Sequence, residues 1–388
     1  MQSFFPPARI LMGPGPSDVP ERVRAATARA TVGHLDPAFQ ALMEETKAGL
    51  SRAFRAPDHA CIPLPGPGTA GMEAAMLNLL EPGEVAVVAV NGLFGGRMAE
   101  MAARAGAEVV RVEHAWGEPV DPERIEAALW ARRAKVLAFV HAETSTGTLT
   151  EPAPLCRIAR EHGALTVVDC VTSLAGSPVN VAEWDADVVY AGTQKCLSAP
   201  PGLAPFAFGP RAREALAARK TPVRTWLHDL SLLMSYWDAE GGRAYHHTAP
   251  VNAVYGLHEA LTMLFEEGLE ASIARHRRMH EALASGLAAL GLDFLPAKAC
   301  RTPQLNAVRT PDEIDEAAVR ARMLDRYGLE IGAGVGELRG RIWRIGLMGA
   351  SAAPRHVRLC LAALAEALAA QGLKVSAADA LAAAEARL

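Results

Sequence analysis

The chain has 388 residues, 50% of them hydrophobic, and this length allows two domains with a large buried core. The formal net charge is -4 with both signs mixed, which excludes the basic surface of a nucleic-acid-binding protein and any attraction to acidic membranes. No run of about 18 uninterrupted apolar residues predicts a transmembrane helix. Residues 1–16 lack the charged start and the apolar core of a secretory signal.

The six cysteines are scattered along the chain and form no C-x-x-C or Cys/His cluster. We therefore expect neither a disulfide framework nor a zinc site, and a reducing, cytoplasmic setting fits best. The last three residues, Ala-Arg-Leu, loosely resemble a peroxisomal targeting signal, and the sequence leaves open whether they act as one.

The N-terminal segment, residues 1–16, is irregular and mixes apolar residues with prolines, which is typical of an arm that lies across another surface. The run Gly13-Pro14-Gly15-Pro16 excludes a helix. Because Gly13 has no side chain, a substrate can approach its backbone, although ordinary turn chemistry explains the run equally well. Helices are predicted from about Glu21 and over Pro37–Phe54.

Short apolar runs and helical segments then alternate, which predicts an α/β fold. The predicted strands of this part span residues 85–90, 109–112, 136–140, 165–168, 187–190 and 204–208. Before them, an apolar segment leads through a glycine-rich turn into a helix. The N-H groups at such a helix start bind anions, so Gly68 and Thr69 are candidates for holding a phosphate, although the signal is weak on its own.

A long helical stretch, residues 251–290, leads into the C-terminal part, where strands are predicted at 304–308 and 341–347. A final alanine-rich helix is predicted within residues 375–388. We expect three parts, an N-terminal arm, a large domain and a small C-terminal domain, with the bounds 1–16, 17–267 and 268–388.

Two neighbouring apolar runs lead to an acid and a lysine, the two strongest candidates for catalytic residues. The first run stops at Asp169. The second, residues 187–190, stops at Ala-Gly, and Thr193, Gln194 and Lys195 come next. Ligands of an open parallel sheet sit outside the carboxyl ends of its strands, so both charged side chains should face one crevice. With only six lysines against 33 arginines in the chain, Lys195 stands out.

A lysine in such a crevice can form a Schiff base with an aldehyde, and a nearby carboxylate can keep a pyridinium nitrogen protonated. Asp169 and Lys195 would then be the working pair of an enzyme that uses pyridoxal 5'-phosphate (PLP). The spacing alone leaves a plainer alternative open, in which Asp169 caps a helix and Lys195 is a solvated loop charge.

The run AGTQKCLSAPPG, with VVDCVTSLAG before it and YHHTAPV and WRIGLMG after it, resembles the class V PLP-dependent aminotransferases. The likeness is to the branch of alanine:glyoxylate and serine:pyruvate aminotransferases, and it extends from LMGPGP to the RIG near the end. It implies the type I fold of PLP-dependent transferases, with a mostly parallel seven-stranded sheet in the large domain and a smaller C-terminal α/β domain. It also implies a homodimer with shared active sites and an arm that wraps the partner.

The resemblance further implies a role for each site residue. Lys195 would hold the cofactor and shuttle a proton, Asp169 would face the ring nitrogen, and Arg344 would bind the substrate carboxylate near Gly13. Phe94 would cover the ring where the family commonly has Trp. The complete set of expected cofactor contacts is Gly68, Thr69, Phe94, Thr144, Asp169, Gln194, Lys195, Tyr245 and Thr248, the last two reaching the partner subunit's cofactor.

Some of these residues have other readings. Arg344 interrupts an apolar strand, and a guanidinium binds a carboxylate in fork geometry, but a structural salt bridge would also explain it. The adjacent His246 and His247 suggest a metal. We expect no metal site, because no third ligand lies nearby and neighbouring extended residues point to opposite faces.

The expected reaction moves an amino group between alanine or serine and glyoxylate or pyruvate. A 2-aminoethylphosphonate aminotransferase would keep the same Lys and Asp, and a pyridoxamine:pyruvate aminotransferase would need a second arginine where this chain has Val335. A cysteine desulfurase would need Cys300 or Cys360 as a nucleophile. A non-catalytic scaffold would have no reason to retain Asp169, Lys195 and Arg344 together. Arg339 or Arg341 remain possible partners for a second substrate carboxylate.

Overall fold

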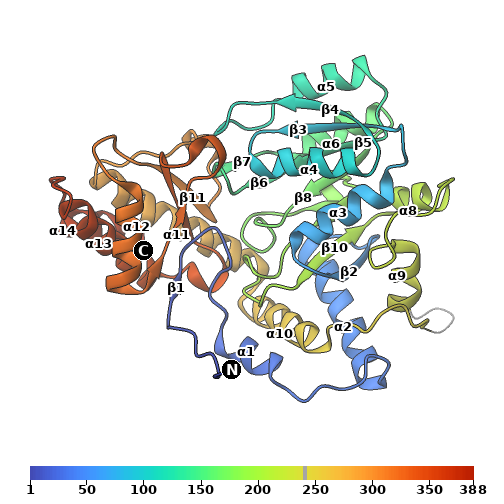
Figure 1. Cartoon of the computed structure of the whole chain (residues 1–388), viewed down its shortest axis with the longest axis horizontal. Coiled ribbons are helices and arrows are strands. Elements are labelled where there is room, and N and C mark those ends of the chain that lie inside the picture. Colours follow the sequence, from blue (N-terminus) through green and yellow to red (C-terminus); the bar gives the residue numbers. More distant parts are fainter. Residues whose placement is uncertain (239–242) are drawn as a thin grey trace.

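The structure, a computed structural model, describes residues 1–238 and 243–388 (Figure 1). Its centre is a seven-stranded sheet with the strand order β2-β10-β9-β8-β5-β3-β4. All strands run parallel except β10, which is antiparallel to both of its neighbours. The bounds are β2 (Ala60–Pro65), β3 (Val85–Val90), β4 (Glu108–Glu113), β5 (Val136–Val140), β8 (Leu165–Asp169), β9 (Val188–Tyr190) and β10 (Leu203–Phe208). The predicted fold class is confirmed.

Helices precede, alternate with and follow these strands along the chain. They are α1 (Glu21–Thr27), α2 (Pro37–Phe54), α3 (Gly68–Leu79), α4 (Leu93–Arg104), α5 (Pro122–Ala131), α6 (Pro152–Glu161), α7 (Val181–Trp184), α8 (Pro210–Ala217), α9 (Leu230–Trp237) and α10 (Val251–Glu267). A small hairpin, β6 (Ala142–Glu143) with β7 (Thr148–Leu149), follows β5. Within the described residues, no helix is long and apolar enough to cross a membrane.

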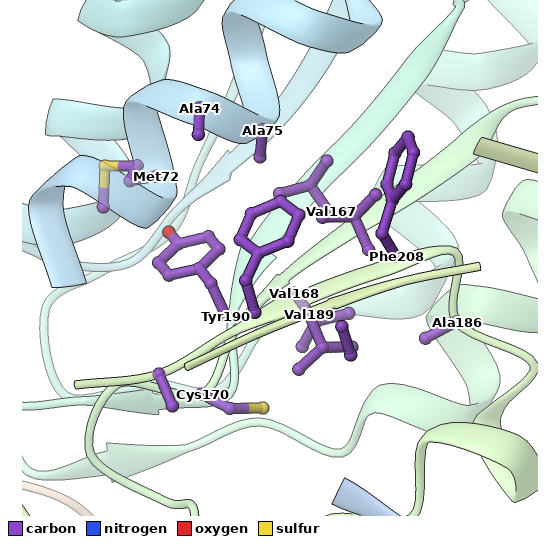
Figure 2. Close-up of a cluster of buried hydrophobic side chains, with 14 of the residues drawn as sticks. Met72, Ala74, Ala75, Val167, Val168, Cys170, Ala186, Val189, Tyr190 and Phe208 are labelled. Carbon is purple, nitrogen blue, oxygen red and sulfur yellow. The ribbon is translucent and has the colours of Figure 1, made fainter. Parts of the chain in front are cut away.

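The central strands are buried on both faces, which is why they are rich in β-branched residues. Figure 2 shows Tyr190 of β9 directed towards α3, whereas the preceding Val189 points to the other side of the sheet. Gly71 makes this close packing possible, because a Cβ there would lie only 3.0 Å from the Tyr190 Cβ. The helix that begins at Gly68 is thereby fixed against the strand that leads to Lys195.

The C-terminal part has its own antiparallel sheet, in the order β11-β14-β13, and its own hydrophobic core. Figure 1 shows this part, in orange and red, beside the large domain. Its elements are α11 (Leu269–Ala289), β11 (Leu305–Arg309), α12 (Glu316–Tyr327), β12 (Leu329–Glu330), β13 (Gly332–Ala333), β14 (Ile342–Gly346), α13 (Pro354–Ala369) and α14 (Ala377–Glu385). Helix α10 ends and α11 begins at Gly268, which has a backbone φ of 93°.

The N-terminal arm joins the two parts. Its strand β1 (Ile10–Leu11) pairs in parallel with β12, and Met12 is fully buried in the core of the C-terminal part. The Met12 carbonyl accepts a hydrogen bond from Gly346 N (2.6 Å), and a few residues later Ser17 N donates to the Gln194 carbonyl (2.9 Å). The arm therefore runs from the small sheet directly to the loop that carries Lys195.

Candidate active site

Asp169 and Lys195 line one pocket at the carboxyl ends of β8 and β9. Asp169 is the last residue of β8, and Lys195 lies in the loop that follows β9. The other predicted residues that line the same pocket are Gly68, Thr69, Phe94, Thr144 and Gln194. The structure thus brings together residues that lie up to 127 positions apart in the sequence.

The Asp169 carboxylate is fully buried and held from two directions. One oxygen accepts from Val171 N (2.8 Å) and the other from the Tyr190 hydroxyl (2.9 Å). Burial nevertheless raises the pKa of Asp169 to about 7, because the two hydrogen bonds and the charge of Lys195 oppose the desolvation only in part. A cationic ring nitrogen beside it would favour the charged form.

The Lys195 side chain is buried, and this burial lowers its pKa to about 8. A larger fraction of the amine is therefore neutral near neutral pH, and the neutral amine is the nucleophilic form. Its Nζ donates to the carbonyl oxygen of Pro14 in the N-terminal arm. Gly15, with a φ of 111°, packs so closely on this lysine that a Cβ would overlap Nζ.

The start of α3 offers a cradle for an anion. No side chain caps this helix N-terminus, so the N-H groups of Gly68 and Thr69 remain available, whereas Ala70 N donates to the Pro67 carbonyl (2.7 Å). A Cβ at Gly68 would overlap the Val171 side chain, so only glycine fits there. Nearby, the buried Oε1 of Gln194 has no hydrogen-bond partner, and because the two ends of an amide are distinguished only by their partners, this group can equally present its NH₂ to an anion.

Phe94 is held by a buried glutamate that the sequence analysis did not single out. Glu143 Oε2 accepts from Phe94 N (3.0 Å) and Gly95 N (3.4 Å) at the start of α4. Its Oε1 accepts from Ser145 N (3.0 Å) and the Ser145 hydroxyl (2.6 Å). Burial raises the pKa of Glu143 against these hydrogen bonds. An acid three residues after a fully apolar strand was the signal available in the sequence.

Arg344 on β14 is not among the residues that line the pocket, but it contacts Thr144, which does line it. Its Nε donates to the Ala333 carbonyl (2.7 Å) and its Nη1 to the Thr144 carbonyl (3.4 Å). Among the described residues no carboxylate forms an ion pair with Arg344, which counts against a structural salt bridge as its role. Two carbonyls leave further N-H groups of the guanidinium available to a carboxylate. Arg339 and Arg341 are exposed and do not line the pocket.

The remaining predicted residues lie outside the pocket of this chain. Gly13 packs beside Glu330 and Gly332, and it is Pro14 and Gly15 that meet Lys195. The Tyr245 side chain is 64% exposed with its ring against His34, and Thr248 is exposed as well.

The argument that His246 and His247 point to opposite faces is wrong. Their Nδ1 atoms lie 2.9 Å apart, because the chain has no regular strand at this position and the two-residue alternation does not apply. Within the described residues, no group of three or more His, Cys, Asp and Glu side chains could hold a metal ion.

The pocket has a matching group for each reactive part of PLP. The Lys195 amine can form a Schiff base with the aldehyde, and the Asp169 carboxylate can pair with the protonated ring nitrogen. The uncapped start of α3 and Gln194 can bind the phosphate. On a doubly covered, mostly parallel sheet, this combination assigns the protein to the PLP-dependent transferases.

Comparison with known proteins narrows the class. The model of the family Aminotransferase class-V matches residues 18–340, and the chain belongs to this family, whose members depend on PLP. An alanine–glyoxylate aminotransferase of Drosophila melanogaster is 36% identical over 94% of this chain and 93% of its own length.

Two solved structures are similar over nearly their whole length. The alanine–glyoxylate aminotransferase of Nostoc sp. has a TM-score of 0.93 and 41% identity, covering 95% of this chain and 97% of its own. The ureidoglycine–glyoxylate aminotransferase of Bacillus subtilis has a TM-score of 0.97 and 37% identity, covering 99% of both chains. The protein is therefore a class V aminotransferase.

The shifted pKa values predict how the stability of the cofactor-free protein depends on pH. Asp169 binds its proton more tightly in the folded chain (pKa about 7) than in the unfolded one (model value 3.8), so its contribution to the free energy of unfolding falls as the pH rises between these values. Lys195 binds its proton less tightly when folded (pKa about 8 against 10.5), so its contribution rises between these values.

Denaturation midpoints measured across this pH range check both slopes. Asp169→Asn should remove the fall in the free energy of unfolding between pH 3.8 and about 7. Lys195→Met should remove its rise between about pH 8 and pH 10.5. Curves that keep the wild-type shape in both variants would show that neither group is titrating as the structure indicates.

Proposed function

We propose that this class V aminotransferase moves an amino group between a small amino acid, alanine or serine, and a small 2-oxo acid, glyoxylate or pyruvate. The observation that carries the proposal is the shared pocket of Lys195 and Asp169. The Arg344 guanidinium, which forms no ion pair within the described residues, contacts the pocket residue Thr144. Glyoxylate is named for the Drosophila, Nostoc and Bacillus relatives alike, which favours it as the acceptor.

The proposed chemistry divides between cofactor and protein. When bound, PLP supplies an aldehyde to receive the amino group and a ring that takes up the electron pair of the breaking α C-H bond. Lys195 anchors the cofactor and moves the α-proton as general base and then general acid. Asp169 keeps the ring nitrogen protonated, and Tyr190 and Val171 N hold its carboxylate in place for this.

The other residues orient the reactants. Gly68, Thr69 and Gln194 bind the phosphate, and Phe94 covers the ring. Arg344 fixes the substrate carboxylate beside Thr144, and the arm lies against Lys195 at Pro14 and Gly15, directly after Gly13. A single guanidinium suits a substrate with one carboxylate, because a second would be buried without a partner.

We further propose a homodimer in the cytoplasm with shared active sites. The exposed Tyr245 side chain supports this, because Tyr245 and Thr248 of the partner subunit can then complete the phosphate site. Residues 1–9 are exposed, with Phe4 at 83% and Phe5 at 85%, as suits an arm that wraps a partner. All six cysteines are free, which suits a reducing compartment.

(S)-Ureidoglycine is a second candidate donor, because the Bacillus structure of that specificity covers the whole chain. A cysteine desulfurase is disfavoured. No cysteine of the described residues lines the pocket, Cys360 is fully buried in α13, and burial raises the pKa of Cys300. Val335, in place of a second arginine, counts against pyridoxamine as the donor.

Lys195→Ala should abolish transamination while leaving the protein folded, because it removes the anchor and the proton carrier but little packing. The rate should fall by at least about 100-fold, the lower range for general acid–base catalysis. Asp169→Asn should still bind PLP but turn over slowly. Stopped assays of amino transfer, with circular dichroism as the folding control, check both; near-normal turnover of either variant would contradict its assigned role.

A mixing experiment tests the shared site. Lys195→Ala protein and a Tyr245→Phe, Thr248→Val double variant should each be poorly active alone. Heterodimers of the two should recover activity, because one of their two sites carries both intact contributions. Tagged subunits would verify that heterodimers form, and their failure to gain activity would mean that each subunit builds its own pocket.

Steady-state kinetics test the substrate class. Alanine, serine and (S)-ureidoglycine are compared as donors with glutamate and aspartate, and glyoxylate and pyruvate as acceptors with 2-oxoglutarate. Substrates with one carboxylate should have the highest kcat/KM, and Arg344→Ala should raise KM for the best of them. A preference for glutamate or 2-oxoglutarate would show that the pocket pairs a second carboxylate.

A further inference from the structure

Arg97 lines the pocket next to the proposed phosphate site, and neither the motifs nor the expected cofactor contacts include it. It lies one turn after Phe94 on α4, so both side chains share one face of the helix. The Arg97 guanidinium lies 4.9 Å from the centre of the Phe94 ring, and its Nη1 donates to the Thr69 hydroxyl (3.2 Å). Two residues with proposed cofactor contacts therefore hold this guanidinium in place.

Within the described part of the chain, Arg97 forms no ion pair with a carboxylate. Arg104, on the same helix, does form one, with Glu100 (2.8 Å). The neutral hydroxyl of Thr69 and the face of Phe94 leave the charge of Arg97 without an anion. An unpaired, half-buried guanidinium in a pocket is a binding group for a carboxylate or a phosphate.

The charges of the pocket indicate which anion it binds. Its charged lining residues in the described chain are Arg97, Lys195 and Asp169. In the proposed function Lys195 bonds to the aldehyde and Asp169 faces the ring nitrogen. A phosphate monoester carries about -1.5 to -2 at pH 7, whereas a helix N-terminus supplies only roughly half a positive charge. The Arg97 guanidinium lies beside Thr69 at this N-terminus. It is the cation available to balance the remaining negative charge of the phosphate.

We propose that Arg97 binds the phosphate of the cofactor and so gives the enzyme its preference for pyridoxal phosphate over pyridoxal. The inference rests on the proposed function, because it takes Gly68 and Thr69 as the phosphate site. The Thr69 hydroxyl orients the guanidinium, and the Phe94 ring supports it from the side. The same stacking contact links the group that binds the phosphate with the ring that covers the cofactor.

The test compares PLP with pyridoxal, which has the same ring and aldehyde but no phosphate. Cofactor-free wild-type protein, Arg97→Gln and Arg97→Met are titrated with each compound in phosphate-free buffer, and binding is followed by absorbance. Arg97→Met keeps a long apolar stem against Phe94. Both variants should bind PLP roughly 10- to 100-fold more weakly, the value of a lost charge-assisted hydrogen bond, with unchanged affinity for pyridoxal.

Arg104→Gln is the matched control, because it removes the same charge from the same helix at a position where the side chain is 77% exposed. Its affinity for both compounds should equal that of the wild type. Inorganic phosphate should slow PLP uptake by the wild type and do so much less in Arg97→Gln. Equal weakening of PLP and pyridoxal binding, or unchanged PLP binding, would overturn the role of Arg97.

The outcome separates this inference from the function on which it depends. If the wild-type protein takes up PLP through Lys195 but the Arg97 variants keep its preference for PLP over pyridoxal, only the role of Arg97 fails. If the wild-type protein takes up no PLP, the proposed function fails first. Dissociation of the dimer in Arg97→Gln with unchanged cofactor preference would instead assign Arg97 to a subunit contact and overturn the phosphate role.

Discussion

Burial of two ionisable groups in one pocket is the constraint on which the rest of the site depends. Desolvation moves the pKa of Asp169 up to about 7 and that of Lys195 down to about 8, although their opposite charges favour ionisation. This desolvation follows from the fold, because β8 and β9 are fully buried neighbouring strands and both groups lie at their carboxyl ends. A ligand with an aldehyde for one group and a cationic nitrogen for the other offsets the cost, so the site selects such a ligand electrostatically as well as by shape.

The sequence predicted the local features that short-range chemistry determines. The bounds of α2 agree with the prediction, because Asp36 caps the helix, Pro37 occupies its first turn and Arg55 ends it in the left-handed conformation. Strand β3 also has its predicted bounds, since a β-branched run between charged and glycine-containing turns has few alternatives. Asp169 and Lys195 could be located for a similar reason, as Asp169 ends one such run and Lys195 lies five residues after another.

Contacts between distant segments could not be predicted in this way. Lys195 donates a hydrogen bond to the Pro14 carbonyl, but nothing near Lys195 in the sequence indicates this contact. The sequence pattern indicated Gly13 instead. The position of β10 between β2 and β9 is a matter of strand order, which hydrophobic periodicity does not encode. Glu143 went unnoticed because its four donors come from α4 and from Ser145, and only the folded chain brings α4 to it.

The arm connects the small sheet directly to Lys195. Strand β14 carries Arg344, and two residues later Gly346 N holds the Met12 carbonyl, from which the chain reaches Pro14 and Lys195. A Cβ at Gly346 would overlap the Gly13 carbonyl, so the arm can follow this path only past a glycine. One strand thus positions both the group proposed to bind the substrate carboxylate and the backbone that contacts the lysine. Because β14 carries Arg344 and also holds the arm through Gly346, the position of this strand relative to the large sheet sets the positions of the Arg344 guanidinium and of the Pro14 carbonyl at Lys195.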